Sequence, residues 1–168
     1  MSKTIVTQIT FDAIDLRLLS LLQVDASPSN QDLAARAHVS PATCLRRVRR
    51  LTQLGVIRRR VALLDSDRLA PCIQAICEIT LDRQGAEHIE AFEQVAVAHP
   101  AVQQCYRVSP GPDVILVATA PDMPAWAAMA AGLFTQQANV RNVKTFFVLR
   151  CTKFDTTMPL PDPTSTPR

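Results

Sequence analysis

Arginines in one short predicted helix are the residues of this sequence whose type and spacing best suit a chemical task. Residues 40–51 read SPATCLRRVRRL. Ser40 suits the N-cap, because its hydroxyl can accept from a free first-turn N–H, and Pro41 sits where its missing N–H costs nothing. At about 100° per residue the apolar side chains gather on one side. This predicts a core-facing stripe of Cys44, Leu45, Val48 and Leu51.

The remaining surface of this helix is basic and contains no acid. Its outward face and flanks comprise Ala42, Thr43, Arg46, Arg47, Arg49, Arg50 and Gln53. Arginine binds phosphate as a planar fork and can reach the O6/N7 edge of guanine. The face therefore fits a polyanion, although a solvated Arg-rich helix without a partner would show the same pattern.

A second capped helix is predicted immediately before the basic one. Residues 29–37 read SNQDLAARA, with Ser29 as N-cap and Asp32 three positions later, which resembles a capping box. Only His38 and Val39 separate the two helices, and neither is the Gly often found in such a turn. Two capped helices joined by a tight turn predict a helix-turn-helix, whose second helix enters the major groove of duplex DNA.

This geometry predicts a role for each exposed residue, because the N-terminal end of a recognition helix enters the groove. The residues expected to face base edges are Ala42, Thr43 and Arg46. Phosphate contacts are expected from Arg47, Arg49 and Arg50, with Ser40 offering its hydroxyl or N–H. Two copies related by a two-fold axis would imply a pseudo-palindromic site on double-stranded DNA.

Over more than fifty residues the sequence resembles the N-terminal half of the leucine-responsive/asparagine-responsive (Lrp/AsnC) transcription regulators. The residues that carry the resemblance are Asp12, Asp15, Asn30, Leu33, Ala34, Ser40, Pro41, Cys44, Arg47, Leu51, Gly55, Val56, Ile57, Leu64 and Asp65. The resemblance implies a DNA-binding regulator with a winged-helix-like helix-turn-helix domain over residues 1–65. A first helix over residues 11–24, capped by Asp12, and a basic linker strand over residues 56–65 complete this domain.

Strand and helix patterns alternate in the second half of the chain. The predicted strands are 72–81, 102–108, 114–120 and 143–151, and the predicted helices are 85–98 and 122–137. The residues expected to be buried by these helices are Ile89, Phe92, Val95, Trp126, Met129, Leu133 and Phe134. The order β-α-β-β-α-β predicts a ferredoxin-like domain over residues 66–151, which makes the whole chain α+β. A Pro-rich, extended tail over residues 152–168 follows.

The resemblance extends to this domain, which in the family senses ligands and forms oligomers. It implies a homo-oligomer, a dimer or a higher assembly such as an octamer, and a small effector such as an amino acid. The effector-binding positions that it implies are Tyr106, Gly111, Asp113 and Asp122. The turn reads Pro-Gly-Pro-Asp where the family often has Gly-Asp-Tyr-Asp, and the prolines remove two N–H donors. We therefore expect an unusual effector or a weak response to common amino acids, while Asp113 could equally only end a turn.

Charge separates the two halves of this chain of 168 residues. Residues 1–64 hold 10 Lys/Arg and 4 Asp/Glu, a net +6, and residues 65–168 hold 8 and 11, a net −3. A basic N-terminal part joined to a mildly acidic remainder suits a DNA-reading domain attached to a sensor or assembly domain. No apolar run approaches membrane-spanning length and the first residues lack a signal-peptide core, so we expect a cytoplasmic protein without a membrane partner.

The five cysteines, at positions 44, 72, 77, 105 and 151, are scattered. Cys72 and Cys77 are an odd number of residues apart in a predicted strand, so they should point to opposite faces. We therefore expect buried structural thiols, with no metal site and no cofactor.

Two other functions fit parts of the pattern. Ferredoxin-like domains also host enzymes, and some haem-biosynthetic decarboxylases resemble the same family. His88 and His99 have no acid–base or nucleophile partner at a suitable spacing, so no catalytic residue is assigned. An effector-binding module whose DNA-binding half is inactive is the second alternative, and the uninterrupted arginine face speaks against it.

Overall fold

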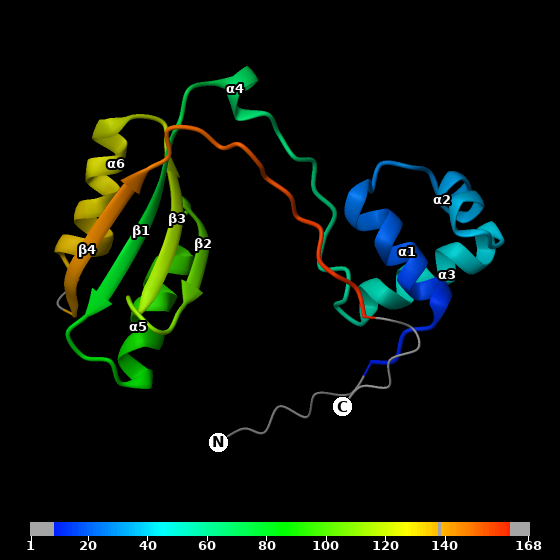
Figure 1. The fold of residues 1–168 in the computed structure, drawn as a ribbon, viewed down its shortest axis with the longest axis horizontal. Coiled ribbons are helices and arrows are strands. Elements are labelled where there is room, and N and C mark those ends of the chain that lie inside the picture. Colours follow the sequence, from blue (N-terminus) through cyan, green and yellow to red (C-terminus); the bar gives the residue numbers. More distant parts are fainter. Residues whose placement is uncertain (1–8, 138, 162–168) are drawn as a thin grey trace. The chain divides into compact units, whose positions relative to one another are not determined.

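Two compact units divide the chain in this computed structural model (Figure 1). The structure describes residues 9–137 and 139–161, with only the backbone at residues 66 and 67. The helical unit comprises Met1–Leu63 and Lys153–Arg168, and the sheet unit comprises Leu64–Thr152. Residues 162–168 of the predicted tail and residues 1–8 lie outside the described part.

Three helices form the helical unit. They are α1 (Ala13–Val24), α2 (Asn30–Ala37) and α3 (Pro41–Gln53). Each N-cap is the residue that the sequence predicted, because the side chains of Asp12, Ser29 and Ser40 all accept from first-turn N–H groups. One core joins the three helices and consists of Leu18, Leu33, Ala34, Ala37, Cys44 and Val48. The helix-turn-helix is therefore built as expected.

The turn between α2 and α3 uses a histidine where a glycine is common. His38 has φ 56° and ψ 48°, in the left-handed region that few residues with a Cβ adopt. Its N–H donates to the carbonyl of Ala35, and the N–H of Val39 donates to the carbonyl of Ala34. These two bonds form a Schellman motif, which ends α2 and turns the chain into α3.

Two expectations for this unit differ from the structure. Leu45 is 40% exposed, because Cys44, Val48 and Leu51 form the buried centre of α3 and Leu45 lies on the edge of that stripe. The predicted linker strand is not a strand, since residues 58–65 have no regular secondary structure and belong to no strand of the described sheet. The likeness to a winged helix therefore extends to the three helices only.

The sheet unit has the predicted β-α-β-β-α-β order. Its elements are β1 (Ile73–Leu81), α5 (Ala86–Ala98), β2 (Val102–Arg107), β3 (Val114–Ala120), α6 (Met123–Ala130) and β4 (Val140–Phe147). The four strands are antiparallel and lie in the order β2-β3-β1-β4. A short helix, α4 (Ser66–Leu69), precedes β1 and was not predicted. The fold is therefore α+β and ferredoxin-like.

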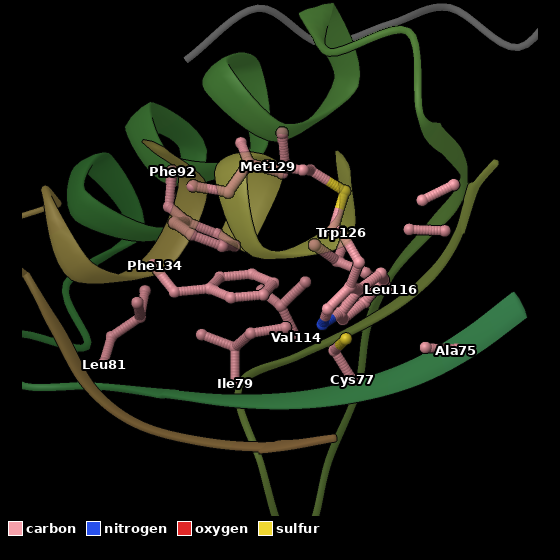
Figure 2. Close-up of a cluster of buried hydrophobic side chains, with 14 residues drawn as sticks. Ala75, Cys77, Ile79, Leu81, Phe92, Val114, Leu116, Trp126, Met129 and Phe134 are labelled. Carbon is pink, nitrogen blue, oxygen red and sulfur yellow. The ribbon is translucent and has the colours of Figure 1, made fainter. Parts of the chain in front are cut away.

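Both long helices of this unit cover the same face of the sheet (Figure 2). The strand residues of the core alternate along β1 and β3, as a half-buried sheet requires. The buried cluster consists of Ala75, Cys77, Ile79, Leu81, Phe92, Ala96, Val114, Leu116, Ala118, Ala120, Trp126, Met129, Leu133 and Phe134. The aromatic packing extends to β4, where the rings of Phe147 and Trp126 lie edge to face with their centroids 5.4 Å apart.

Three details of this unit depart from the prediction. Val95 is 41% exposed, since Phe92 and Ala96 occupy the buried side of α5. The last turn of the α6 region, Ala131–Thr135, is a π-helix. The last strand begins three residues earlier and ends four residues earlier than predicted, because its pairing with β1 runs from Val140 to Phe147.

The opposite face of the sheet is open within this unit. Exposed apolar side chains lie on it in neighbouring strands, where Phe146 pairs with Ile76 and Tyr106 pairs with Ile115. The exposed fractions are 39% for Ile76 and 51% for both Tyr106 and Phe146. We call this surface the open sheet face. No described element of the sheet unit covers it.

The tail beyond Thr152 returns to the helical unit without forming a helix or strand in its described part. Gln23 of α1 holds it through two hydrogen bonds to Met158. The amide nitrogen of Gln23 donates to the carbonyl of Met158 at 3.1 Å, and the N–H of Met158 donates to Oε1 of Gln23 at 3.0 Å. The chain therefore passes twice between its two units.

Candidate functional site

The N-terminal half of α3 presents the predicted DNA-contacting residues on an exposed surface. Ser40, Ala42, Arg46 and Arg49 are exposed, and Thr43 is half-buried. The hydroxyl of Ser40 accepts from the N–H of Thr43 at 3.2 Å and donates to its Oγ1 at 2.9 Å. The Ser40 hydroxyl is therefore already engaged in hydrogen bonds that cap α3.

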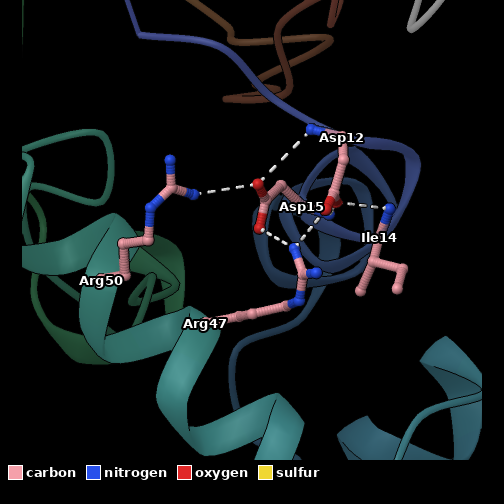
Figure 3. Close-up of polar contacts among 5 residues, drawn as sticks. All are labelled: Asp12, Ile14, Asp15, Arg47 and Arg50. Carbon is pink, nitrogen blue, oxygen red and sulfur yellow. Dashed lines mark hydrogen bonds and ion pairs between the residues drawn. The ribbon is translucent and has the colours of Figure 1, made fainter.

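Two acids at the start of α1 hold one flank of α3 (Figure 3). Asp15 is 2% exposed and accepts from Nη1 of Arg47 at 2.9 Å and from Nη1 of Arg50 at 3.0 Å. Asp12 accepts from the same Nη1 of Arg47 at 2.6 Å. The side chain of Arg47 is only 19% exposed, whereas that of Arg50 is 44% exposed. The two flanks of α3 thus differ, and the sequence analysis missed this division.

Both sides of this cluster are charged. The pKa of Asp12 is lowered first by the N–H of Asp15, which donates to its carboxylate, and further by Arg47. The pKa of Arg47 is raised by its hydrogen bonds to Asp12 and Asp15. A hollow of about 360 Å³ lies beside the cluster and is lined by Thr10, Phe11, Asp12, Asp15, Arg46, Arg47 and Arg50. An anion entering it would meet Arg47 and Arg50, which are already paired with carboxylates, and Arg46, which forms no ion pair with a described residue.

The predicted effector turn is tightly bound to β1. The N–H of Asp113 donates to the carbonyl of Ile79 at 2.9 Å. The carboxylate of Asp113 accepts from the N–H of Leu81 at 2.7 Å and from Nε2 of Gln84 at 3.3 Å. Asp113 therefore anchors the turn, and the same carboxylate keeps further acceptor capacity.

The four predicted effector positions are not brought together within one chain. Gly111 and Asp113 lie in the turn before β3, and Tyr106 lies near that end of β3 on the open sheet face. Asp122 follows the other end of β3 and caps α6 through the N–H of Ala125. A seven-residue strand is about 20 Å long, so Asp122 cannot share a small ligand with the turn of the same chain.

A hollow of about 220 Å³ does lie beside the turn. It is lined by Glu78, Thr80, Gly111, Pro112, Asn142 and Lys144. The four strand residues were missed by the sequence analysis, although polar side chains at alternate positions of β1 and the last strand give a usable signal. They combine a carboxylate with an ammonium group, which suits a polar ligand.

The cysteines differ in burial, and no metal site is found among the described residues. Cys44 and Cys77 are buried, and burial raises the pKa of both thiols. Cys72 and Cys151 are exposed, so the expectation of buried thiols is wrong for these two. Residues 9–137 and 139–161 hold no cluster of three metal-ligating side chains. In the same part of the chain no helix is long and apolar enough to cross a membrane.

Comparison with known families matches both units. Residues 11–52 match the AsnC-type helix-turn-helix domain, and residues 74–158 match the Lrp/AsnC ligand binding domain. The second match alone spans half of the chain.

Individual relatives agree over almost their full lengths. The leucine-responsive regulatory protein of Rhizobium meliloti is 33% identical over 148 residues, which cover 88% of this chain and 95% of that protein. An AsnC family transcriptional regulator from Agrobacterium tumefaciens has a solved structure that is 30% identical, with a TM-score of 0.79 over 89% of this chain and 97% of that chain. A transcriptional regulator from Neisseria meningitidis, solved as a complex with L-Met, is 28% identical. Its TM-score is 0.80, and the match covers 89% of this chain and 97% of that chain.

These matches decide between the functions that the sequence left open. Both halves match the domains of one family of DNA-binding regulators, and the relatives are transcriptional regulators, which favours a regulator over an effector-binding module with an inactive DNA-binding half and over the decarboxylase-like alternative. The chain is therefore a DNA-binding transcriptional regulator with a ligand-binding domain, and it belongs to the Lrp/AsnC family.

Proposed function

We propose that this regulator recognises an inverted-repeat DNA site by inserting α3 into the major groove. The single observation that carries the proposal is the exposed arginine face of a well-capped α3. Arg46 and Arg49 form no ion pair with any described residue, so both are available to DNA. Because the start of a recognition helix meets the base edges, we assign base contacts to Ala42, Thr43 and Arg46.

Phosphate contacts would come from the residues around this face. Arg49 is exposed, and Arg50 is nearly half exposed and can offer a second nitrogen while Nη1 stays on Asp15. The N–H of Ser40, at the start of α3, is placed to meet a phosphate. Arg47 contributes least in this scheme, because Asp12 and Asp15 already occupy its Nη1.

Selection of bound duplexes from a random pool tests this function directly. We expect enrichment of an inverted repeat whose half-sites lie about 10 base pairs apart or a multiple of that, because two recognition helices on one side of DNA are separated by whole helical turns. A pool enriched without two-fold symmetry would contradict the proposed mode of binding. In bacterial cells such as those of the relatives, chromosomal DNA lies in the cytoplasm, where we place this activity.

We further propose that the assembly is a homodimer or a larger homo-oligomer formed through the open sheet face. Ile76, Tyr106 and Phe146 expose apolar surface on neighbouring strands. A sheet with helices on one face alone is normally completed by a second layer. A second copy of the chain supplies that layer and also the two-fold axis that an inverted repeat requires.

The effector in this proposal is a small polar molecule bound beside the turn before β3. The likeness to a regulator solved with L-Met supports an amino acid or a related compound. The turn itself offers few donors, because Pro110 and Pro112 have no N–H and that of Asp113 is donated to Ile79. The free carboxylate of an amino acid would therefore depend on Lys144, and its ammonium group on Glu78 or Asp113.

Calorimetry and sedimentation with the twenty amino acids test this assignment. We expect dissociation constants of about 1 mM or weaker for ordinary amino acids, because the turn offers few N–H donors. Asp113→Asn keeps an acceptor for the N–H of Leu81 but removes the charge, so it should weaken any ammonium ligand by roughly tenfold. Binding and assembly state should change together, since a ligand that favours one assembly shifts the equilibrium toward it. Tight binding of leucine that Asp113→Asn leaves unchanged would contradict the assignment.

A further inference from the structure

The acids at the start of α1 occupy the groups on α3 that would otherwise meet DNA phosphate. Nη1 of Arg47 donates to Asp12 at 2.6 Å and to Asp15 at 2.9 Å, and Nη1 of Arg50 donates to Asp15 at 3.0 Å. A carboxylate and a phosphate present the same kind of oxygen acceptors to a guanidinium fork. The two acids and the DNA backbone would therefore compete for the same nitrogens.

Arg47 is the arginine most affected by this competition. Its side chain is 19% exposed, and its Nε is buried without a hydrogen-bond partner among the described residues. To reach a phosphate it would have to leave two charge-assisted hydrogen bonds, one of them to an acid that is 2% exposed. Asp15 would then keep Arg50 but lose Arg47, and weakening the pairing of a buried carboxylate is unfavourable. Phosphate therefore gains little from Arg47 as long as both acids are present.

Two other arginines of α3 show no such restraint. Arg46 and Arg49 are exposed, and no acid of the described chain forms an ion pair with them. Arginines on the same helix thus fall into two groups, one available to DNA and one held by α1. Affinity for DNA of any sequence depends on the number of phosphates neutralised, whereas sequence preference depends on base contacts. Withholding an arginine from phosphate therefore lowers affinity for DNA of any sequence and leaves sequence preference unchanged.

We propose that Asp12 limits the affinity of this regulator for the DNA backbone, because it competes with DNA phosphate for Arg47 and so weakens binding to DNA of any sequence. The proposal rests on the DNA-binding function described above. Asp15 shares the contact, but it is buried and also holds Arg50, so a change there could alter folding as well as DNA affinity. Asp12 lies at the exposed end of the cluster, where its side chain is 52% exposed.

Asp12→Asn is the informative variant because it keeps the structural role of this residue. The Asp12 side chain caps α1 by accepting from the N–H groups of Ile14 and Asp15 at 3.0 and 2.9 Å. Asparagine is as good an N-cap as aspartate, so α1 should remain intact. Asparagine carries no charge, so it competes with phosphate for Arg47 far less well. Far-ultraviolet circular dichroism and thermal unfolding of the full chain would verify that the variant is folded.

The experiment measures binding of the full-length protein to a random-sequence duplex between about 50 and 200 mM salt. One added phosphate contact steepens the slope of log K against log salt by about 0.9 for each DNA-bound helix-turn-helix. For each DNA-bound helix-turn-helix, we therefore expect Asp12→Asn to bind random DNA roughly threefold more tightly at the lower salt and to lose roughly threefold more of its affinity than wild type by the higher salt, which makes about tenfold for a dimer bound through both. Affinity for the selected site should rise by a similar factor, so the ratio of specific to random binding should stay the same.

Two further variants separate this mechanism from a general charge effect. Asp32→Asn removes the same charge from an acid whose carboxylate accepts from the Ser29 hydroxyl and forms no ion pair with a described arginine, so it should change random binding and the slope clearly less. The gain from Asp12→Asn should disappear when it is measured in an Arg47→Gln background, that is, when the double variant is compared with Arg47→Gln alone. An unchanged slope in Asp12→Asn, an equal gain in Asp32→Asn, or a gain that survives Arg47→Gln would each overturn the inference. Failure of wild type to bind any duplex would instead overturn the proposed function.

Discussion

Arg46→Ala is expected to lower affinity for the selected DNA site by about 1–3 kcal/mol, which is roughly 5- to 150-fold. Arg46 lies near the start of α3, is exposed, and has no ion-pair partner in the described chain, so nothing competes with a base for its guanidinium. Removing a base-reading arginine also removes the preference at the base pair that it reads. Binding measured on a panel of sites with single changes should therefore show relaxed preference at one position of each half-site.

Arg49→Ala is the matched control, because it removes the same charge from the same helix on the flank away from Asp15. We expect it to weaken binding to all members of the panel by a similar factor and to reduce the slope of log K against log salt by about 0.9 per DNA-bound helix-turn-helix. If the two variants behave alike on this panel, the assignment of Arg46 to a base and of Arg49 to phosphate is wrong.

Phe146→Asp is expected to dissociate the assembly, raising the dissociation constant between subunits by about 100-fold or more. Phe146 is half exposed on the edge strand β4 and pairs with Ile76 of β1 on the open sheet face. Its exposure means that the fold of a single subunit tolerates a change there. A buried carboxylate without a partner at the contact between two subunits would cost far more than the lost apolar contact. Sedimentation velocity of the full chain at micromolar concentration measures this change.

Val97→Asp is the control for this prediction, since it introduces the same carboxylate on an exposed apolar residue of α5. Val97 is 66% exposed and lies on the helix side of the sheet, away from the open sheet face. This variant should sediment as wild type does. If Phe146→Asp also sediments as wild type, the open sheet face is not the subunit interface.

Local order in this chain was predictable because it depends on neighbouring residues. The caps Asp12, Ser29 and Ser40 precede their helices directly, and each accepts from an N–H only two or three residues away. The alternation that buries one face of β1 and β3 is a property of any pleated strand, so it too can be read from sequence. The order of elements followed from these local patterns.

Residues whose position depends on pairing or on the edge of a helix stripe were less predictable. The last strand runs from Val140 because β1 offers its partner there, and nothing in the residues themselves marks that start. Leu45 and Val95 lie at the edges of apolar stripes, where a small rotation of the helix decides between core and solvent.

For function, the sequence by itself determined that α3 is a basic, exposed recognition helix, because capping residues and apolar spacing orient a helix without reference to the rest of the chain. The tertiary structure alone decided which arginines remain available. Asp15 lies 32 residues before Arg47 and 35 before Arg50, and only the packing of α1 against α3 brings these charges within hydrogen-bonding distance. It likewise placed Asp122 and Asp113 at opposite ends of β3. Contacts between distant segments depend on how whole elements pack, and the spacing of residues along one element does not contain that information.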